Sequence, residues 1–473
     1  MKRGIAPTGG ARGGAVATRT LRFLFDPVPS FDDNADITMT QPRLASWLLA
    51  AFGAFLVFLA LPWPAPAAGI DAPRGALILS GGHEAEPAPV PSAPPRVAPV
   101  MSPVPTSELR LAEATLDRVA NRYVAPLGSG RAVLTTVPRL QERIEKVLSD
   151  HRVPWAAAVL LEPSTGRVLA MAEHSQREPG RRGLSLEARA PAASVFKIVT
   201  SSALLRRGFE PGAEVCYHGG QHRVRPSLLA DDPRRDRRCL SLSSALGKSA
   251  NVVFAKLADR ALNATLLRAE ADRFLFNRPI PFAQRVETSR AEIPEESFAL
   301  ATTAAGFGPV RLSPLHGAVV ASIIANGGVF VPPDVVASSS GAVARPTVEP
   351  WRVLDEPVAA ELAAMMRTTV TEGTGRRAFR APRSRQSSMR GLTVAGKTGS
   401  LSEADPFRDY SWFVGFAPAD NPRVAFAVVV VNDHNWRVKA PAVARAAVEA
   451  WADWDGGRLE VTAAAPRARA RRP

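Results

Sequence analysis

The sequence predicts an α/β domain in which one β-sheet is assembled from two distant parts of the chain and a helical subdomain is inserted between them. Two apolar runs at 156–173 are joined by turn residues, which is typical of a β-hairpin. Further strand-like runs follow between 391 and 432. Helical patterns dominate from 193 to 276 and return at 302–328. Strands at both ends with helices between them indicate one sheet with a helical insertion.

The segment before the hairpin is predicted to be helical. Residues 107–123 place most of their apolar side chains loosely on one side, as an amphipathic helix does. A second helix is expected at 139–151. We therefore expect a short helical N-terminal segment at 106–154 ahead of the main domain at 155–455.

The elements after the insertion are a helix, three strands and a final helix. The two helices are expected at 361–373 and 441–454. Pro418 and Pro422 bound the loop between the second and third strands. The three strands are predicted at 391–400, 410–419 and 424–432. A basic, disordered tail is expected at 456–473.

An apolar stretch without a charge occupies the 18 positions at 44–61. This length is near the minimum for a spanning helix, and the basic residues before it orient the N-terminus toward the cytoplasm. We predict a disordered cytoplasmic stretch at 1–43, a transmembrane anchor or uncleaved signal at 44–61, and a proline-rich linker at 62–105. Cleavage after the small-residue patch Ala65–Ala67 is the open alternative.

The chain is strongly basic, with a formal net charge of +15. Its basic residues are spread along the sequence and cluster only at 234–238 and in the tail. Because no base-stacking platform or groove-reading motif accompanies them, we expect no nucleic-acid partner. A basic surface fits an anionic membrane or an envelope polymer.

Cys216 and Cys239 are the two cysteines of the chain, and both fall in the part predicted to lie outside the membrane. An oxidising compartment favours a disulfide between them. His218 and His222 lie inside the loop that this disulfide closes, so a zinc site is the alternative. The spacing fits no common zinc pattern, and we expect the disulfide and no metal.

Three short motifs occur in order along the predicted domain, and their order and setting carry more weight than any one of them. They are Ser194-Val195-Phe196-Lys197, Ser249-Ala250-Asn251 and Lys397-Thr398-Gly399. In the first, a serine one helical turn before a lysine shares a face with the amine. A desolvated lysine near other cations has a lowered pKa and can act as a base. We predict that Ser194 is a nucleophile and Lys197 its activator.

The second and third motifs supply groups that hold and protonate a substrate. Ser249 and Asn251 would diverge on a helix, whereas a turn leading into a helix aims both at one cleft. We expect Ser249 to relay a proton and Asn251 to bind the substrate backbone. Lys397 and Thr398 suit a substrate carboxylate, although strand alternation turns them to opposite faces. An edge strand here can pair with an extended peptide.

With their neighbours, the three motifs resemble the transpeptidase domain of penicillin-binding proteins. The similarity covers about 133–454 and includes VLLEPSTGRVLAMAE before the first motif, TEGTG before the third, and WFVGFAPADNPRVAFAVVV after it. The resemblance implies a five-stranded, mainly antiparallel sheet flanked by helices, with an inserted helical subdomain. The implied catalytic residues are Ser194, Lys197 and Ser249, and the implied substrate-binding residues are Asn251, Lys397, Thr398, Gly399 and Ser400. The backbone N–H groups of Ser194 and Ser400 are expected to form the oxyanion hole.

The resemblance also implies the reaction, the partners and the location. In this family the serine is acylated by the penultimate D-Ala of a peptidoglycan stem peptide, and an amine of a neighbouring stem peptide then attacks. β-Lactam antibiotics imitate D-Ala-D-Ala and trap the acyl-enzyme. The expected partners are stem peptides, the cytoplasmic membrane and other cell-wall synthesis proteins. The expected location is the inner membrane, with a single span and an extracytoplasmic catalytic domain, and no cofactor is implied.

Three other functions remain as alternatives at this point. A D,D-carboxypeptidase uses water in place of the amine, and sequence separates the two poorly. A class A β-lactamase requires an added glutamate to activate a deacylating water, usually within a Glu-x-x-Leu-Asn segment. No such segment follows Asn251 in the sequence. A catalytically inactive cell-wall scaffold would be expected to have lost a motif, and all three are intact. The region between 62 and 133 is too short for the glycosyltransferase domain of bifunctional members, so a monofunctional enzyme is expected.

Overall fold

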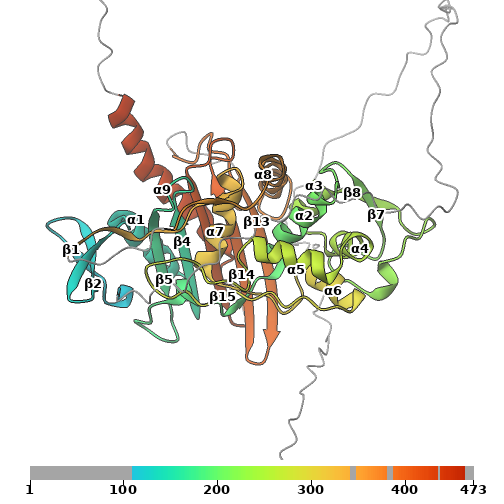
Figure 1. Cartoon of the computed structure of the whole chain (residues 1–473), viewed down its shortest axis with the longest axis horizontal. Coiled ribbons are helices and arrows are strands. Elements are labelled where there is room, and N and C mark those ends of the chain that lie inside the picture. Colours follow the sequence, from blue (N-terminus) through green and yellow to red (C-terminus); the bar gives the residue numbers. More distant parts are fainter. Residues whose placement is uncertain (1–108, 341–347, 381–386, 435–436, 464–473) are drawn as a thin grey trace, which may run out of the picture. The chain divides into compact units, whose positions relative to one another are not determined.

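The computed structural model describes residues 109–340, 348–380, 387–434 and 437–463 (Figure 1). The predicted cytoplasmic stretch, the apolar segment at 44–61 and the proline-rich linker lie outside the described residues. Among the helices that the structure describes, none combines the length and the apolar character that a membrane crossing requires.

The central sheet has five strands, and every neighbouring pair is antiparallel. The hairpin from the early part of the domain pairs with the last of the three late strands, so the predicted sheet from distant segments is confirmed. The strand order is β13 (Ala395–Ala404), β14 (Phe407–Ala417), β15 (Val424–Asn432), β4 (Trp155–Leu161) and β5 (Val168–His174).

Helices cover both faces of this sheet. On β4, Ala157 and Val159 belong to the core shared with α7 (Pro314–Ala325). Their neighbours Ala156 and Ala158 face a second core formed with α1 (Pro138–Asp150) and α9 (Ala440–Ala463). This two-residue alternation along buried strands gives three layers, helix, sheet and helix.

A helical subdomain lies beside the β13 edge of the sheet (Figure 1). Its helices are α2 (Lys197–Arg206), α3 (Leu242–Lys248), α4 (Asn251–Ala261), α5 (Ala264–Arg273) and α6 (Ser297–Ala304), and α8 (Glu356–Thr371) packs between α3 and β13. Short pairs complete the strands: β6 (Ala190–Pro191) with β9 (Arg311–Leu312), β7 (Glu214–Tyr217) with β8 (Arg238–Ser241), and β10 (Val329–Phe330) with β12 (Trp351–Arg352). The 3₁₀ turns are Leu111–Glu113, Leu184–Leu186, Ala193–Phe196 and Pro226–Leu228.

The predicted helical N-terminal segment is wrong in its first half. Residues 115–134 form the strands β1 (Thr115–Asp117), β2 (Arg122–Leu127) and β3 (Gly130–Leu134). They join β11 (Val336–Ser340) in a four-stranded sheet, which ties this segment to the main domain. The weak helical pattern does not decide the structure here, because β3 pairs with β11 from far along the chain and because β2 and β3 bury alternate side chains.

The predicted disordered tail begins too early. Helix α9 continues through Gly456 and Gly457 to Ala463, so the expected boundary at 455 falls inside a helix. Glycine lowers helix propensity by about 1 kcal/mol per residue, which weakens a helix without necessarily ending it. The rest of the tail lies outside the described residues.

Candidate active site

A cleft of about 520 Å³ opens where strand β13 meets the helical subdomain. The three sequence motifs converge on it. Six predicted site residues line the cleft, namely Ser194, Ser249, Asn251, Thr398, Gly399 and Ser400. The other two, Lys197 and Lys397, are completely buried next to it.

The first motif lies on a continuous helical segment. A 3₁₀ turn at Ala193–Phe196 runs directly into α2, which begins at Lys197. This brings Lys197 Nζ to 2.9 Å from Ser194 Oγ. On the far side, Gly399 allows β13 to approach, since a Cβ there would lie 3.1 Å from Val195 Cγ2 and 3.3 Å from the Ala192 carbonyl. Ser194 is therefore held between the start of a helix and a strand.

The surroundings of Lys197 favour its neutral form. Burial and, secondarily, the nearby Lys397 ammonium hold the pKa of Lys197 well below its ordinary value. Its Nζ also lies 2.7 Å from Asn251 Oδ1 and 2.5 Å from the Ala305 carbonyl oxygen. These two oxygens can only accept hydrogen bonds, so they use both N–H groups of a neutral amine. The amine lone pair is then directed at the remaining neighbour, Ser194 Oγ.

A break between two helices presents the second motif. Helix α3 ends at Lys248, and Ser249 adopts a left-handed conformation with φ of 56°. Ala250 is extended and α4 begins at Asn251. The predicted turn leading into a helix is thus confirmed, and it turns both polar side chains into the cleft. A non-glycine residue in this conformation costs on the order of 1 kcal/mol, a strain that is common where a functional side chain must be aimed.

The third motif divides its two polar side chains between two positions. Lys397 Nζ donates to Ser249 Oγ and to the Thr398 carbonyl, each at 2.9 Å, and lies behind the cleft wall. Burial lowers the pKa of Lys397 to about 7. Thr398 lines the cleft, and its Oγ1 lies 2.5 Å from Thr374 Oγ1. This division follows from strand alternation, and it puts Lys397 in contact with Ser249 rather than in the cleft itself.

The comparisons with known proteins agree with this geometry. The family model described as the penicillin binding protein transpeptidase domain matches residues 156–449. The chain belongs to this family. A relative named peptidoglycan D,D-transpeptidase PbpA, from Mycobacterium tuberculosis, is 30% identical over 370 residues, which are 67% of this chain and 70% of the relative. The chain is a serine-type transpeptidase.

Solved structures give the same result. The crystal structure of PBPA from M. tuberculosis has a TM-score of 0.55 and 27% identity, covering 68% of this transpeptidase and 82% of that chain. An imipenem acyl-enzyme complex of the same M. tuberculosis protein has a TM-score of 0.55 and 26% identity, covering 68% and 79%. The sheet and the helical subdomain are therefore those of a penicillin-binding transpeptidase domain.

Several residues of the transpeptidase cleft were missed by reasoning from the sequence. Thr374 belongs to the TEGTG segment that supported the resemblance, and this placement next to a motif was the available signal. The others are His222, Arg223, Gly306, Phe307, Ser411, Trp412, Lys439 and Pro441. Ser411 and Trp412 lie on β14, where Trp412 begins another segment that supported the resemblance, and Pro441 lies on α9, while the remaining residues come from loops.

Gly306 forms part of the cleft wall against the backbone of Ser194. Its φ is +93°, and a Cβ there would lie 2.6 Å from the Ala193 carbonyl oxygen and 2.9 Å from Ser194 N. We expect Gly306→Ala to displace Ser194 and lower acylation by about a hundredfold, because catalysis depends steeply on the position of reacting atoms. The rate of labelling by a fluorescent penicillin measures this.

The matched control for Gly306→Ala is Gly208→Ala. Gly208 has a similar φ of +86°, but an added Cβ there meets no described atom within 4 Å. It therefore carries the same backbone strain without the collision. Equal losses of labelling in the two variants would mean that strain alone, and not displacement of Ser194, explains the effect.

Proposed function

We propose that this chain is a peptidoglycan D,D-transpeptidase that cross-links stem peptides through an acyl-enzyme on Ser194. The observation that carries the proposal is the environment of Lys197, which is buried, has a lowered pKa and donates to two oxygens that can only accept. Such an amine is a base poised next to a serine hydroxyl.

Acylation begins when Ser194 Oγ attacks the carbonyl carbon between the two terminal D-Ala residues and its proton passes to Lys197 Nζ. The developing oxyanion accepts hydrogen bonds from the backbone N–H groups of Ser194 and Ser400, each of which is worth roughly 3 kcal/mol in such sites. The C–N bond then breaks. The leaving nitrogen takes a proton from Ser249 Oγ, which is replenished from Lys397 at 2.9 Å.

Substrate is held on both sides of the scissile bond. The Asn251 amide accepts a hydrogen bond from the backbone of the substrate peptide and donates another to it. Thr398 binds the terminal carboxylate of the substrate. The positive charge of Lys397 adds attraction from behind Ser249. Before the second half of the reaction, the proton that Lys197 took from Ser194 passes to Lys397, so Lys197 is neutral again and Lys397 is recharged. An amine of a neighbouring stem peptide then attacks the ester carbon and gives a proton to Lys197, which passes it to Ser194 Oγ as the ester bond breaks.

The proposal places the catalytic domain outside the cytoplasmic membrane, with the segment at 44–61 as its anchor. The bond between Cys216 and Cys239 supports an oxidising compartment, because disulfides persist there. The same proposal makes β-lactams inhibitors, and it makes other cell-wall synthesis proteins partners at the membrane.

The deciding test is the labelling of the full chain by a fluorescent penicillin beside Ser194→Ala. We expect stable covalent label on the wild type and none on the variant, with a mass increase on the peptide that contains Ser194. Label that forms and is rapidly lost would indicate hydrolysis, as in a D,D-carboxypeptidase. A folded wild-type chain that takes no label would refute the catalytic proposal and favour a scaffold.

A further inference from the structure

The loop between Cys216 and Cys239 borders the active site and is bonded to the same helix that carries Asn251. The predicted disulfide is present and joins paired positions of β7 and β8. Inside the loop, the His222 carbonyl accepts a hydrogen bond from Asn251 Nδ2 at 2.8 Å. The Gln221 carbonyl accepts from Val252 N at 3.2 Å. The loop therefore contacts the first turn of α4.

The contact at His222 decides how the Asn251 amide is oriented. An amide side chain has one accepting oxygen and one donating nitrogen, and exchanging them reverses its hydrogen bonds. Because Nδ2 donates to the His222 carbonyl, Oδ1 faces Lys197 Nζ at 2.7 Å. The reverse orientation would point an N–H group at the lysine amine. A loop residue thus controls a hydrogen bond of the catalytic base.

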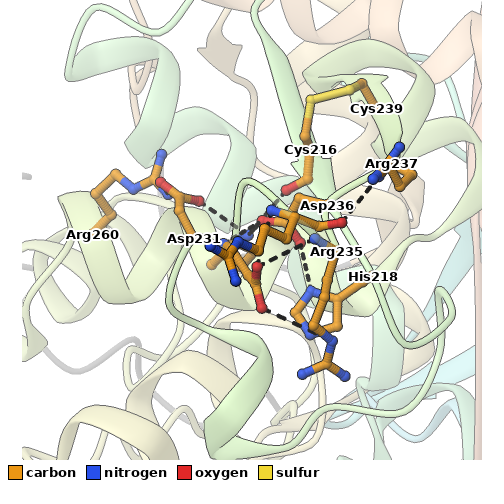
Figure 2. Close-up of polar contacts among 11 residues, drawn as sticks. Cys216, His218, Asp231, Arg235, Asp236, Arg237, Cys239 and Arg260 are labelled. Carbon is orange, nitrogen blue, oxygen red and sulfur yellow. Dashed lines mark hydrogen bonds and ion pairs between the residues drawn. A yellow bond between two sulfur atoms is a disulfide. The ribbon is translucent and has the colours of Figure 1, made fainter. Parts of the chain in front are cut away.

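A buried polar cluster holds this loop in place, and Asp236 is at its centre (Figure 2). One carboxylate oxygen of Asp236 lies 2.5 Å from His218 Nδ1. The other accepts from Lys256 Nζ at 2.7 Å and from Asp232 N at 3.0 Å. Lys256, which is fully buried on α4, also donates to the Cys216 carbonyl at 3.0 Å. The cluster therefore ties both ends of the loop to α4.

The charge on Asp236 suits this role. Burial acts to raise the pKa of its carboxyl, but hydrogen bonds led by that from Lys256 outweigh burial and hold the pKa well below its ordinary value. The side chain is only 5% exposed, so it remains an ionised carboxylate in a protected position. Both of its oxygens accept hydrogen bonds, which an amide of the same shape cannot do.

We propose that Asp236, together with the disulfide, is a positioning residue for the acylation step. It fixes the loop so that the His222 carbonyl keeps Asn251 Oδ1 directed at Lys197. The inference rests on the proposed function, in which Lys197 activates Ser194. Asp236 itself lies outside the cleft and acts through Asn251.

A double-mutant cycle in the full chain tests the proposal. Asp236→Asn is measured alone and in an Asn251→Ala background, with the second-order rate constant of fluorescent penicillin acylation as the readout. We expect Asp236→Asn to lower the rate about tenfold when Asn251 is present. In the Asn251→Ala background it should change the rate little, because the side chain it positions is gone.

The controls separate positioning from general loss of structure. Asp259→Asn makes the same chemical change at an exposed site of α4 that is bonded to Ser297, and it should leave the rate unchanged. Cys216→Ala combined with Cys239→Ala provides a second way to release the loop. This double variant should show the same loss of acylation rate, and the loss should again depend on Asn251. If Asp236→Asn fails to fold, the double cysteine variant takes its place in the cycle.

Each outcome is decisive. An equal loss in both backgrounds, or no loss in the single variant, overturns the positioning role. A wild-type chain that takes no label refutes the proposed function instead. A labelled wild type with an uncoupled Asp236 refutes this inference alone.

Discussion

Replacing Lys197 by methionine is expected to lower acylation of Ser194 by about a thousandfold, the range typical of a lost general base. Methionine fills similar space without an amine, so the buried site stays packed. The proton of Ser194 Oγ would then have no acceptor at 2.9 Å. The second-order rate constant for fluorescent penicillin labelling, measured beside the unfolding temperature, separates this from loss of the fold.

Lys146→Met is the matched control for the Lys197 variant. Lys146 is an exposed lysine on α1, with 74% of its side chain accessible, so the same chemical change should leave labelling unaffected. If Lys197→Met kept more than a tenth of the wild-type rate, another group would have to remove the proton from Ser194.

Replacing Lys397 by methionine is expected to stabilise the fold while abolishing most activity. Burial holds the pKa of Lys397 at about 7, which means that the folded protein resists its charge. Removing that penalty outweighs the two lost hydrogen bonds, and we expect a net gain of roughly 2 kcal/mol in the free energy of unfolding at pH 6. Acylation should fall because Ser249 loses its proton source. Such a trade between stability and activity is common at functional sites.

The pH dependence gives this prediction its sign. The pKa of a lysine in the unfolded chain is about 10.4, so between pH 7 and 10.4 the unfolded state binds more protons and stability rises with pH. The penalty of Lys397 is therefore fully present below pH 7 and disappears as the pH approaches 10. The advantage of Lys397→Met should shrink between pH 6 and pH 9 in denaturant titrations. A constant or growing advantage would contradict it, and Lys146→Met again serves as the neutral control.

The central fold could be predicted from the sequence because its strands carry strong local patterns. In β15 and β4 nearly every position is apolar, which marks strands buried on both faces. The segment at 115–134 was misread because its local pattern is ambiguous. Its last strand, β3, pairs with β11, and a partner so distant in sequence leaves no local signal.

The sequence predicted which residues line the site better than it predicted how those residues are arranged. The three motifs identified both lysines, and their convergence on one cleft agrees with that choice. That Lys397 lies behind Ser249 depends on how β13 docks beside the break after α3. The contribution of His222 depends on a loop that only the folded chain brings next to Asn251.

The sequence by itself determined which groups are predicted to do the chemistry, since the expected nucleophile, base and disulfide partners follow from residue type and order. Only the tertiary structure decided how those groups behave. A lysine becomes a base when its ammonium is desolvated and placed near another cation, and both conditions arise from packing. The Ala305 carbonyl, Asn251 and Lys397 reach Lys197 from three separate segments of the chain. Desolvation is a property of that assembled surrounding, which no short stretch of sequence contains.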